Sequence, residues 1–463
     1  MRASAQESAA RAVIEVPGAP VPPGWSQAVA AGGWLFVSGT MATDYRNGLA
    51  PEARIDPRRA HLQDALELQS KHLLETIGAT LKAGGCDIRR DILRVWQWAP
   101  SNYPSAKDYE HGRERWPRFH SATPYARMLK EMVGDPRRSS TGIGVRQLPV
   151  PGALMCADLI AAQPRTGVEK HAFRAPEGVP QPEIGYSPAT RWGDWVFLAG
   201  FGATDFRGDW KSSVHMGEPG MTAPEARVNP YIWLGSEIEA QTDYTLRMMS
   251  RIAEAAGTSF TRCVKADVTI GYPTDFLGMD RVWRTWFPNN PPARNVVSGA
   301  QFVIKGLRVE IALQFLAGDS ALELRTISLA DIPAPPGYAP HAVKAGDFLF
   351  LSTQLPIDHD GAVPDDLRCN PALPYFRQNA RRQAEFIFER AAAICQAAGA
   401  SLANTCKVQA FFDDLVFLPQ MLDAWRSAFP TAPPALTAVG MGGPQPLLAP
   451  GAHVQMDFIV YAP

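Results

Sequence analysis

Three stretches of the chain share one pattern of small and apolar residues. GGWLFVSG (32–39), GDWVFLAG (193–200) and GDFLFLST (346–353) each place a small-residue turn before a run of aromatic and aliphatic residues. A short apolar run bounded by small residues is typical of a strand that is buried on both faces. The chain is therefore expected to contain three copies of a longer pattern.

A helix and a further strand follow in each copy. LKAGGCDIRRDILRVWQW (81–98), AEAAGTSFTRCVKADVTI (253–270) and CQAAGASLANTCKVQAFF (395–412) each indicate the end of a helix, a glycine cap and a strand. In the third copy the preceding helix has apolar residues at a spacing that keeps one face toward a sheet, namely Ala380, Ala384, Ile387, Ala391 and Ile394.

A second helix and a glycine-led strand complete each copy. The second helices are expected around Trp116, Trp283 and Trp425. The final strands are GALMCADLIAA, GLRVEIALQFL and GAHVQMDFIVY, at 152–162, 306–316 and 451–461. Their first glycines lie about 150 residues apart, which is the length of a small domain. Proline-rich joints separate the copies and should act as short, stiff connectors.

This element order predicts an α+β fold with helices on one face of each sheet. We expect three tandem units at residues 1–165, 166–319 and 320–463. The faces that the helices leave uncovered can pack together in a closed three-fold arrangement, an intramolecular pseudo-trimer with three clefts between units. The chain is then expected to be a monomer or a dimer of chains.

Composition and charge exclude several classes of protein. The chain is 46% hydrophobic and 20% charged, as globular proteins are. It has 45 basic and 46 acidic residues, so its charge indicates neither nucleic acid nor an anionic membrane surface as a partner. Neither a secretory signal nor an apolar run of about 20 residues occurs. We therefore expect a cytoplasmic protein without a membrane partner.

The residues typical of metal and cofactor sites lack the usual spacing. The nine histidines show no HExxH pairing, and neither a phosphate-binding loop nor a GxSxG elbow is present. We therefore expect no metal and no cofactor. The six cysteines lack CxxC spacing and are expected to be reduced, buried thiols: Cys86, Cys156, Cys263, Cys369, Cys395 and Cys406.

Four phrases of the middle copy carry a family resemblance. IGYSPAT, GDWVFLAG, PPARNVV and LRVEIALQF resemble, in order, the tyrosine turn, the Ser-Gly strand, the Pro-Ala-Arg motif and the Glu-bearing final strand of the RidA/YjgF family of enamine/imine deaminases. The likeness spans nearly the whole chain as three successive matches. It implies a chorismate-mutase-like α+β fold, chemistry without a cofactor, and sites built across unit boundaries.

The resemblance assigns roles to residues of the middle copy. Arg294 would hold a substrate carboxylate, because a guanidinium offers two parallel donors that match the two carboxylate oxygens. Glu310 would hold the attacking water, and a shielded carboxyl can act as acid or base near neutrality. Tyr186 would be the family's tyrosine at the site. Further substrate contacts are expected from Gly200, Asn295, Ser38, Ser352 and Tyr338.

The first and third copies depart from the family pattern. Ser140 and Leu436 replace the arginine, and Cys156 and Gln455 replace the acid. The middle copy has Ala199 where the family has serine. At most one cleft is therefore expected to bind a carboxylate, and the chain leaves open whether copy one or copy three completes it.

We expect a hydrolase acting on C–N bonds, deaminase-like, with a small carboxylate-bearing imine, enamine or related compound as substrate. Two alternatives stay open: a specialised hydrolase or ring-modifying enzyme acting on aromatic or heterocyclic compounds, and a non-catalytic scaffold that binds a small ligand. Arg294 could also form an ion pair at the surface or between domains, and Glu310 could be an exposed charge on an edge strand. The two tyrosines could simply anchor turns.

Overall fold

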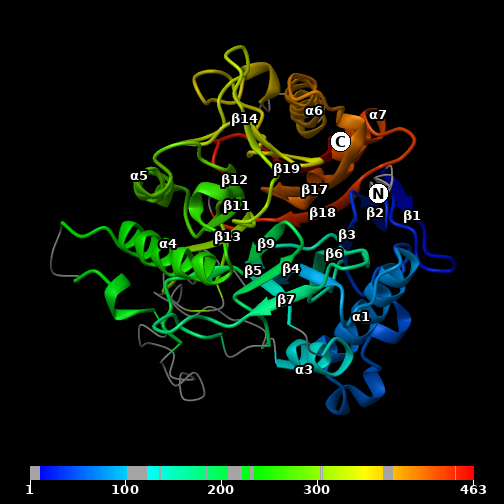
Figure 1. Cartoon of the computed structure of the whole chain (residues 1–463). Coiled ribbons are helices and arrows are strands. Elements are labelled where there is room, and N and C mark those ends of the chain that lie inside the picture. The colour runs from blue at the N-terminus through cyan, green and yellow to red at the C-terminus, as the bar shows by residue number, and fades with distance from the viewer. Residues whose placement is uncertain are drawn as a thin grey trace, which may run out of the picture.

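Three β-sheets, each with its own helices, make up the fold, and the helices lie outside the strands (Figure 1). We call these assemblies unit 1 (β1–β6), unit 2 (β7–β13) and unit 3 (β14–β19). The computed structural model describes residues 11–101, 123–134, 137–182, 185–206, 222–229, 234–302, 304, 306–368, 379–443 and 445–463.

Unit 1 has the sheet order β1-β2-β3-β6-β4-β5, so the last strand in sequence lies inside the sheet. β4 and β5 are parallel, as the helical crossover between them requires, and the other neighbours are antiparallel. The elements are β1 (Ala12–Ile14), β2 (Ala28–Ala31), β3 (Trp34–Thr40), α1 (Ala65–Ala83), β4 (Ile92–Pro100), α3 (Thr123–Met132), β5 (Ser139–Val145) and β6 (Cys156–Ala162).

Units 2 and 3 repeat this topology, with the orders β12-β11-β13-β9-β8-β7 and β14-β15-β16-β19-β17-β18, while β10 pairs with β13. Unit 2 contains β7 (Lys170–Phe173), β8 (Ala189–Trp192), β9 (Trp195–Leu198), β10 (Phe201–Gly202), α4 (Glu237–Ala255), β11 (Cys263–Ile270), α5 (Phe276–Trp286), β12 (Ala293–Val297) and β13 (Val309–Leu316). Unit 3 contains β14 (Leu324–Ile327), β15 (Ala342–Ala345), β16 (Phe348–Leu351), α6 (Asn379–Ala397), β17 (Thr405–Phe412), α7 (Leu418–Ala428), β18 (Ala435–Gly440) and β19 (Val454–Tyr461).

The sequence patterns correspond to these elements. Every residue of β3, β9 and β16 is buried, as the apolar runs predicted. All five apolar residues predicted to face the sheet from α6 are buried. The helices expected around Trp283 and Trp425 are α5 and α7, while Trp116 lies outside the described residues. The α+β architecture in tandem units is therefore confirmed.

The faces of the sheets opposite the helices pack on one another. One hydrophobic cluster, the common centre, includes buried residues from all three sheets. The Trp34 ring of unit 1 stacks on Phe348 of unit 3 with centroids 4.4 Å apart, and its edge contact with Trp195 of unit 2 spans 4.8 Å. Each such side chain gains about 1.5–3 kcal/mol from burial, so the units stabilise one another through this centre.

Hydrogen bonds join the units in a cycle along the edge strands β5, β12 and β18. Each boundary joins the end of one unit's buried strand, or the residues just after it, to another unit's edge strand. Leu436 N–H donates to Ser38 Oγ (2.9 Å), Gly200 N–H to Ser140 O (3.0 Å), and Thr353 N–H to Arg294 O (2.9 Å). Unit 1 therefore meets unit 3, unit 2 meets unit 1, and unit 3 meets unit 2.

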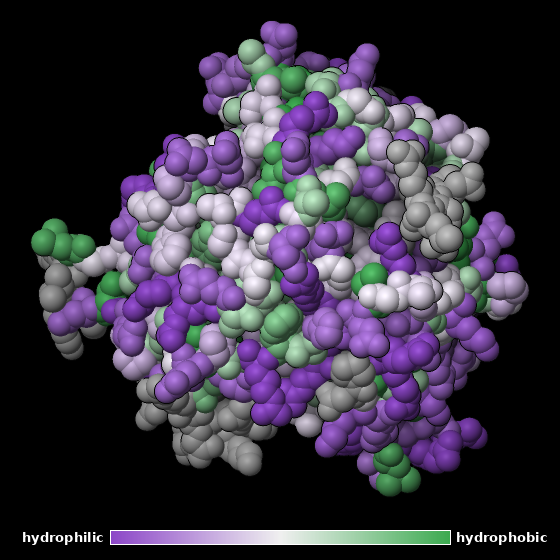
Figure 2. All heavy atoms as spheres, in the orientation of Figure 1, coloured by the Kyte–Doolittle hydropathy of each residue, from purple (hydrophilic) through white to green (hydrophobic). Residues whose placement is uncertain are grey.

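The face of the molecule drawn in Figure 2 is mainly polar. Figure 2 shows hydrophilic residues over most of one face, with hydrophobic residues in small separate groups. None of the helices in the described part of the chain combines the length and apolar character needed to span a bilayer. The five described cysteines are buried and unpaired, as predicted, while Cys369 lies outside the described residues.

Candidate functional site

The strand register shows which residues of the three units are equivalent. β4, β11 and β17 each have an irregularity near their first residue, and the next paired residues are Arg94, Lys265 and Lys407. One position farther along, the parallel partner is Ser140 in unit 1, Arg294 in unit 2 and Leu436 in unit 3. The register thus confirms that Ser140 and Leu436 stand at the position of Arg294.

The strand register also shows which residues are equivalent to Glu310. Cys156, Glu310 and Gln455 pair with residues four positions after the basic residue of the neighbouring strand. Glu310 therefore belongs to the interior strand β13, which excludes the alternative that it is a charge on an edge strand.

Arg294 does not share a site with Glu310. Side chains alternate along a strand, and Ala293 and Val297 face the common centre, so Arg294 faces helix α5. Its Nη2 donates to Oδ1 of Asp280 at 2.6 Å and to the Pro336 carbonyl at 3.2 Å. The sequence led us to expect Arg294 in a cleft beside Glu310, but its side chain is 0% exposed and has a carboxylate partner within the protein.

Asp280 connects this arginine to unit 3. Its Oδ1 also accepts the Tyr338 N–H at 2.9 Å, while its Oδ2 accepts Nε of Arg284 at 3.0 Å. Burial opposes ionisation of Asp280, but the Arg294 charge and these hydrogen bonds outweigh it and lower its pKa. The Tyr338 hydroxyl donates to the Pro288 carbonyl at 3.0 Å, so this tyrosine anchors a turn at the unit 2–unit 3 boundary.

Asn295 and Ser352 lie at the same boundary. The Ser352 hydroxyl accepts the Arg294 N–H at 2.9 Å. Oδ1 of Asn295 accepts hydrogen bonds from Thr353 Oγ1 at 3.1 Å and from Gln455 Nε2 at 3.2 Å. The polar side chains here bind one another, as buried polar groups must.

Ser38 lies at the unit 1–unit 3 boundary. Its hydroxyl donates to the Ser26 carbonyl at 2.5 Å and accepts the Leu436 N–H. The Leu436 side chain packs in the hydrophobic cluster between the sheet and helices of unit 3. An apolar residue therefore takes the place of the arginine at this boundary, in agreement with the sequence.

Glu310 and Gly200 of unit 2 meet unit 1. Together with Tyr186, which interacts with Glu310, and with Arg94, Thr141 and Gly142 of unit 1, they form what we call the Glu310 cluster. A Cβ atom on Gly200 would collide with Oε1 of Glu310 and would lie 2.8 Å from Thr141 Oγ1. Gly142 donates its N–H to the Glu310 carboxyl. Unit 1 thus completes the site of Glu310, whereas unit 3 completes that of Arg294.

The environment of Glu310 suits proton transfer. Burial raises the pKa of its carboxyl to about 8, against the opposing effects of the Arg94 charge and the Gly142 N–H. Burial, followed by the Glu310 charge, raises the pKa of Tyr186. Both side chains remain partly exposed, so protons can exchange with solvent. A carboxyl with such a pKa can act as acid or base near neutral pH.

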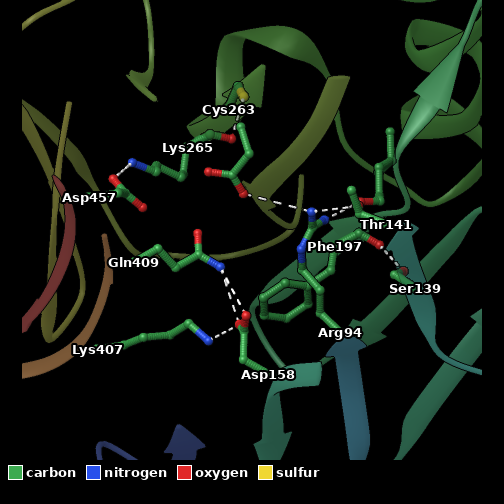
Figure 3. Close-up of polar contacts among 12 residues, drawn as sticks. Arg94, Ser139, Thr141, Asp158, Phe197, Cys263, Lys265, Lys407, Gln409 and Asp457 are labelled. Atoms are coloured by element: carbon green, nitrogen blue, oxygen red, sulfur yellow. Dashed lines mark hydrogen bonds and ion pairs between the residues drawn. The ribbon is translucent and has the colours of Figure 1, made fainter. Parts of the chain in front are cut away.

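Buried ion pairs connect the units, as Figure 3 shows. Lys265 of unit 2 pairs with Asp457 of unit 3, and Lys407 of unit 3 pairs with Asp158 of unit 1. Arg94 has the equivalent position in unit 1, but the position of Asp158 and Asp457 is Ala312 in unit 2. The acid of unit 2 that is paired with Arg94 is Asp267 on β11, whose Oδ2 lies 3.7 Å from Nη2.

Sequence reasoning missed Arg94 and Asp280. A signal for Arg94 was present, because a basic residue recurs at the same place in three apolar strands, as Arg94, Lys265 and Lys407. Asp280 gave no comparable signal, because it is an ordinary polar residue of a surface helix. Over the described part of the chain, no group of three or more His, Cys, Asp or Glu side chains could hold a metal ion.

Three repeated α+β sheets with polar clusters at their mutual boundaries define a tandem-repeat protein with sites between its units. A family model described as Endoribonuclease L-PSP matches residues 177–315 and 330–462. The chain belongs to this family, the RidA/YjgF-like proteins, as tandem copies. Unit 1 lies outside the matched ranges but has the strand order of the other units.

Similar proteins correspond mainly to a single unit. RutC family protein y4sK of Sinorhizobium fredii is 31% identical over 138 residues, which cover 30% of this chain and 97% of that protein. The crystal structure of RidA from the Antarctic bacterium Psychrobacter sp. PAMC 21119 is 29% identical, with a TM-score of 0.23, and covers 30% of this chain and 98% of that one. A chorismatase crystal structure covers 80% of this chain and 93% of its own, at 10% identity and a TM-score of 0.47.

Proposed function

We propose that the chain is a cofactor-independent hydrolase that adds water to a small imine, enamine or related C–N compound, with Glu310 as its acid and base. Membership of the family supports an imine- or enamine-deaminase-like or small-ligand-binding role. The observation that carries the proposal is the partly exposed carboxyl of Glu310, with a pKa of about 8, facing Thr141 and Gly142 of the neighbouring unit.

The reaction requires little more than proton transfer at one position. As a carboxylate, Glu310 takes a proton from water while the water oxygen bonds to the carbon of the C=N group. The same group then gives that proton to the nitrogen, which yields a carbinolamine. Glu310 next takes the proton of the new hydroxyl and passes it to the nitrogen, so that a C=O bond forms, the C–N bond breaks, and ammonia or an amine leaves. With a pKa of about 8, both protonation states are populated near neutral pH. Tyr186 and the Gly142 N–H orient the reacting groups.

Arg294 has no part in this step. Holding a substrate carboxylate would require its guanidinium to leave Asp280, and the two are bonded at 2.6 Å at a different boundary. We therefore place the chemistry at Glu310 and treat carboxylate binding by Arg294 as a separate hypothesis, which the Arg294 variants below test.

The proposal is tested by screening ammonia release from short-lived 2-imino acids. Glu310→Gln keeps the shape of the side chain but cannot exchange a proton, so turnover should fall at least about a hundredfold. Gln455→Asn, at the equivalent position of unit 3, is the matched control and should leave turnover unchanged. Full turnover by Glu310→Gln would refute the proposal.

A second candidate is non-catalytic binding of a small ligand. It is favoured by the separation of Arg294 from Glu310, because the two groups that the resemblance assigned to one site lie at different unit boundaries. Calorimetric titration with a small 2-keto acid distinguishes the two functions. Binding without turnover of any imine in the screen would favour this candidate.

A further inference from the structure

Arg94 departs from the pattern set by its two equivalents. Lys265 and Lys407 occupy the same register position in units 2 and 3, and each forms a close ion pair with an aspartate across a unit boundary. Arg94 lies at 3.7 Å from Asp267, too far for a hydrogen bond. The guanidinium therefore uses its donors elsewhere.

Those donors hold both sides of the Glu310 cluster. Nη1 of Arg94 donates to the carbonyl of Leu198 at 2.5 Å, and Nη2 donates to Oγ1 of Thr141 at 3.1 Å. Leu198 ends β9, two residues before Gly200, and Thr141 lies on β5 of unit 1. One side chain thus fixes the strand end that carries Gly200 and the hydroxyl beside the Glu310 carboxyl.

A forked side chain suits the combination of these two bonds. A guanidinium directs several N–H groups in one plane, so it can bond a carbonyl and a hydroxyl on different strands at once. An ammonium is a compact point charge. Lys265 binds Asp457 and also donates to the carbonyl of Leu351 at 2.7 Å, and Lys407 binds Asp158. Leu351 ends β16 as Leu198 ends β9, so what distinguishes Arg94 is its second bond, to the Thr141 hydroxyl. Arg94 also packs over the ring of Trp96, with Cζ 4.3 Å from the centroid, which holds the guanidinium in place.

We infer that Arg94 is a positioning residue of the Glu310 cluster, which aligns Thr141 and Gly200 with the Glu310 carboxyl and sets the protonation of that carboxyl. This inference rests on the proposed role of Glu310 in catalysis. Arg94 is 2% exposed and acts through its neighbours, not through contact with the substrate.

The charges around Glu310 agree with this role. Arg94 on β4 favours the ionised carboxylate, as does the Gly142 N–H on β5, while Tyr186 faces the carboxyl from the segment before β8. Moving the positive charge away from Glu310 should therefore raise its pKa. At a given neutral pH, a carboxyl group with a higher pKa is ionised in a smaller fraction of the molecules. Less of the carboxylate form, which is the base that activates water, is then present.

Arg94→Lys is the decisive variant, because lysine already occupies the equivalent positions of units 2 and 3. A lysine can keep the carbonyl bond, as Lys265 does, but its single nitrogen should release Thr141, which lies beside the Glu310 carboxyl. We expect the pKa of Glu310 to rise by about one unit, and kcat to fall about tenfold with KM nearly unchanged. The pKa is followed by difference infrared titration of the carboxyl, with Glu310→Gln used to assign the band.

Lys407→Arg is the matched control, because it makes the reverse exchange at a boundary that lacks Glu310. It should leave the Glu310 titration unchanged. If Arg94→Lys does not fold, Thr141→Val removes one acceptor of the guanidinium and should shift the same titration in a smaller degree. If Arg94→Lys folds and changes neither the titration of Glu310 nor kcat, the inference is overturned. If Arg94→Lys does not fold, an unchanged titration of Glu310 in Thr141→Val overturns it.

The infrared titration also separates this inference from the proposed function, because it requires no turnover. If Glu310→Gln retains full activity, the proposed function fails, whatever the titration shows. If Glu310→Gln is inactive and Arg94→Lys changes neither the titration nor kcat, the proposed function stands and the positioning role of Arg94 fails.

Discussion

Replacing Arg294 by alanine separates its structural role from the functional role that the sequence indicated. In the structure the guanidinium is fully buried and bonded to Asp280 and to the Pro336 carbonyl of unit 3. Removing one partner of a buried ion pair costs about 3–5 kcal/mol, because the remaining charge stays buried. Asp280 keeps Arg284 and the Tyr338 N–H, so we expect the lower end, about 3 kcal/mol.

The assay for Arg294→Ala is thermal and urea-induced unfolding of the full chain. For a cooperative unit of about 150–250 residues, each kcal/mol lowers Tm by about 2–4 °C, so a loss of about 6–12 °C is expected. Arg294→Ala combined with Asp280→Ala is the control, because removing both charges should cost less than the sum of the single changes. A Tm within about 2 °C of the wild type, together with lost ligand binding, would refute the structural role and favour carboxylate binding.

The pH dependence of this effect has a definite sign. The folded protein lowers the pKa of Asp280, so the ion pair stabilises the chain above the pKa of the unfolded carboxyl, about 3.9. The stabilisation is lost as the pH falls through the lower pKa of the folded state. The difference in stability between wild type and Arg294→Ala should therefore be full at neutral pH and should shrink in strong acid. A difference that is independent of pH would argue against the ion pair.

Three further predictions concern the Glu310 cluster and the assembly. Folding raises the pKa of Glu310 to about 8, so this carboxyl favours the folded state most below about pH 4.3 and loses that contribution as the pH rises through 8. Urea unfolding at several pH values should show that the free energy of unfolding falls less steeply with pH in Glu310→Gln than in the wild type. Gly200→Ala should displace the Glu310 carboxyl, lower turnover and reduce the free energy of unfolding by about 1–3 kcal/mol. Gly39→Ala is its control: the new Cβ would meet Cys156 Sγ at 3.1 Å, and the Glu310 titration should stay unchanged. Native mass measurement should give one chain or a dimer of chains, and an obligate trimer of chains would contradict an intramolecular pseudo-trimer.

The split between Arg294 and Glu310 bears on how a tandem protein can diverge. In an assembly of identical chains, every boundary has the same residues, so a substitution changes all three boundaries at once. In this chain Glu310 meets Thr141 and Gly142 at one boundary, while Arg294 and Gln455 belong to another. Each boundary can therefore change without affecting the others, and the first is the one at which we propose chemistry.

Much of the fold was determined by local sequence patterns. The strand 346–353, the apolar face of α6 and the final glycine-led strands follow from periodicity and turn residues, which act within about 20 residues of chain. Comparison of the copies also gave the correct equivalents of Arg294 and Glu310, which the strand register confirms. The limits of the three units and the roles of the site residues stay predictions.

Tertiary structure alone decided which residues meet. Arg294 and Glu310 belong to one copy, but side chains alternate along strands and the copies assemble in a cycle. Arg294 therefore faces α5 and unit 3, while Glu310 faces unit 1. Asp280 became the partner of Arg294 through the packing of a helix on a sheet. Arg94 bonds Leu198 of unit 2 because the two units pack against each other. Such contacts depend on distances between segments far apart in the chain, and periodicity within one copy carries no information about them.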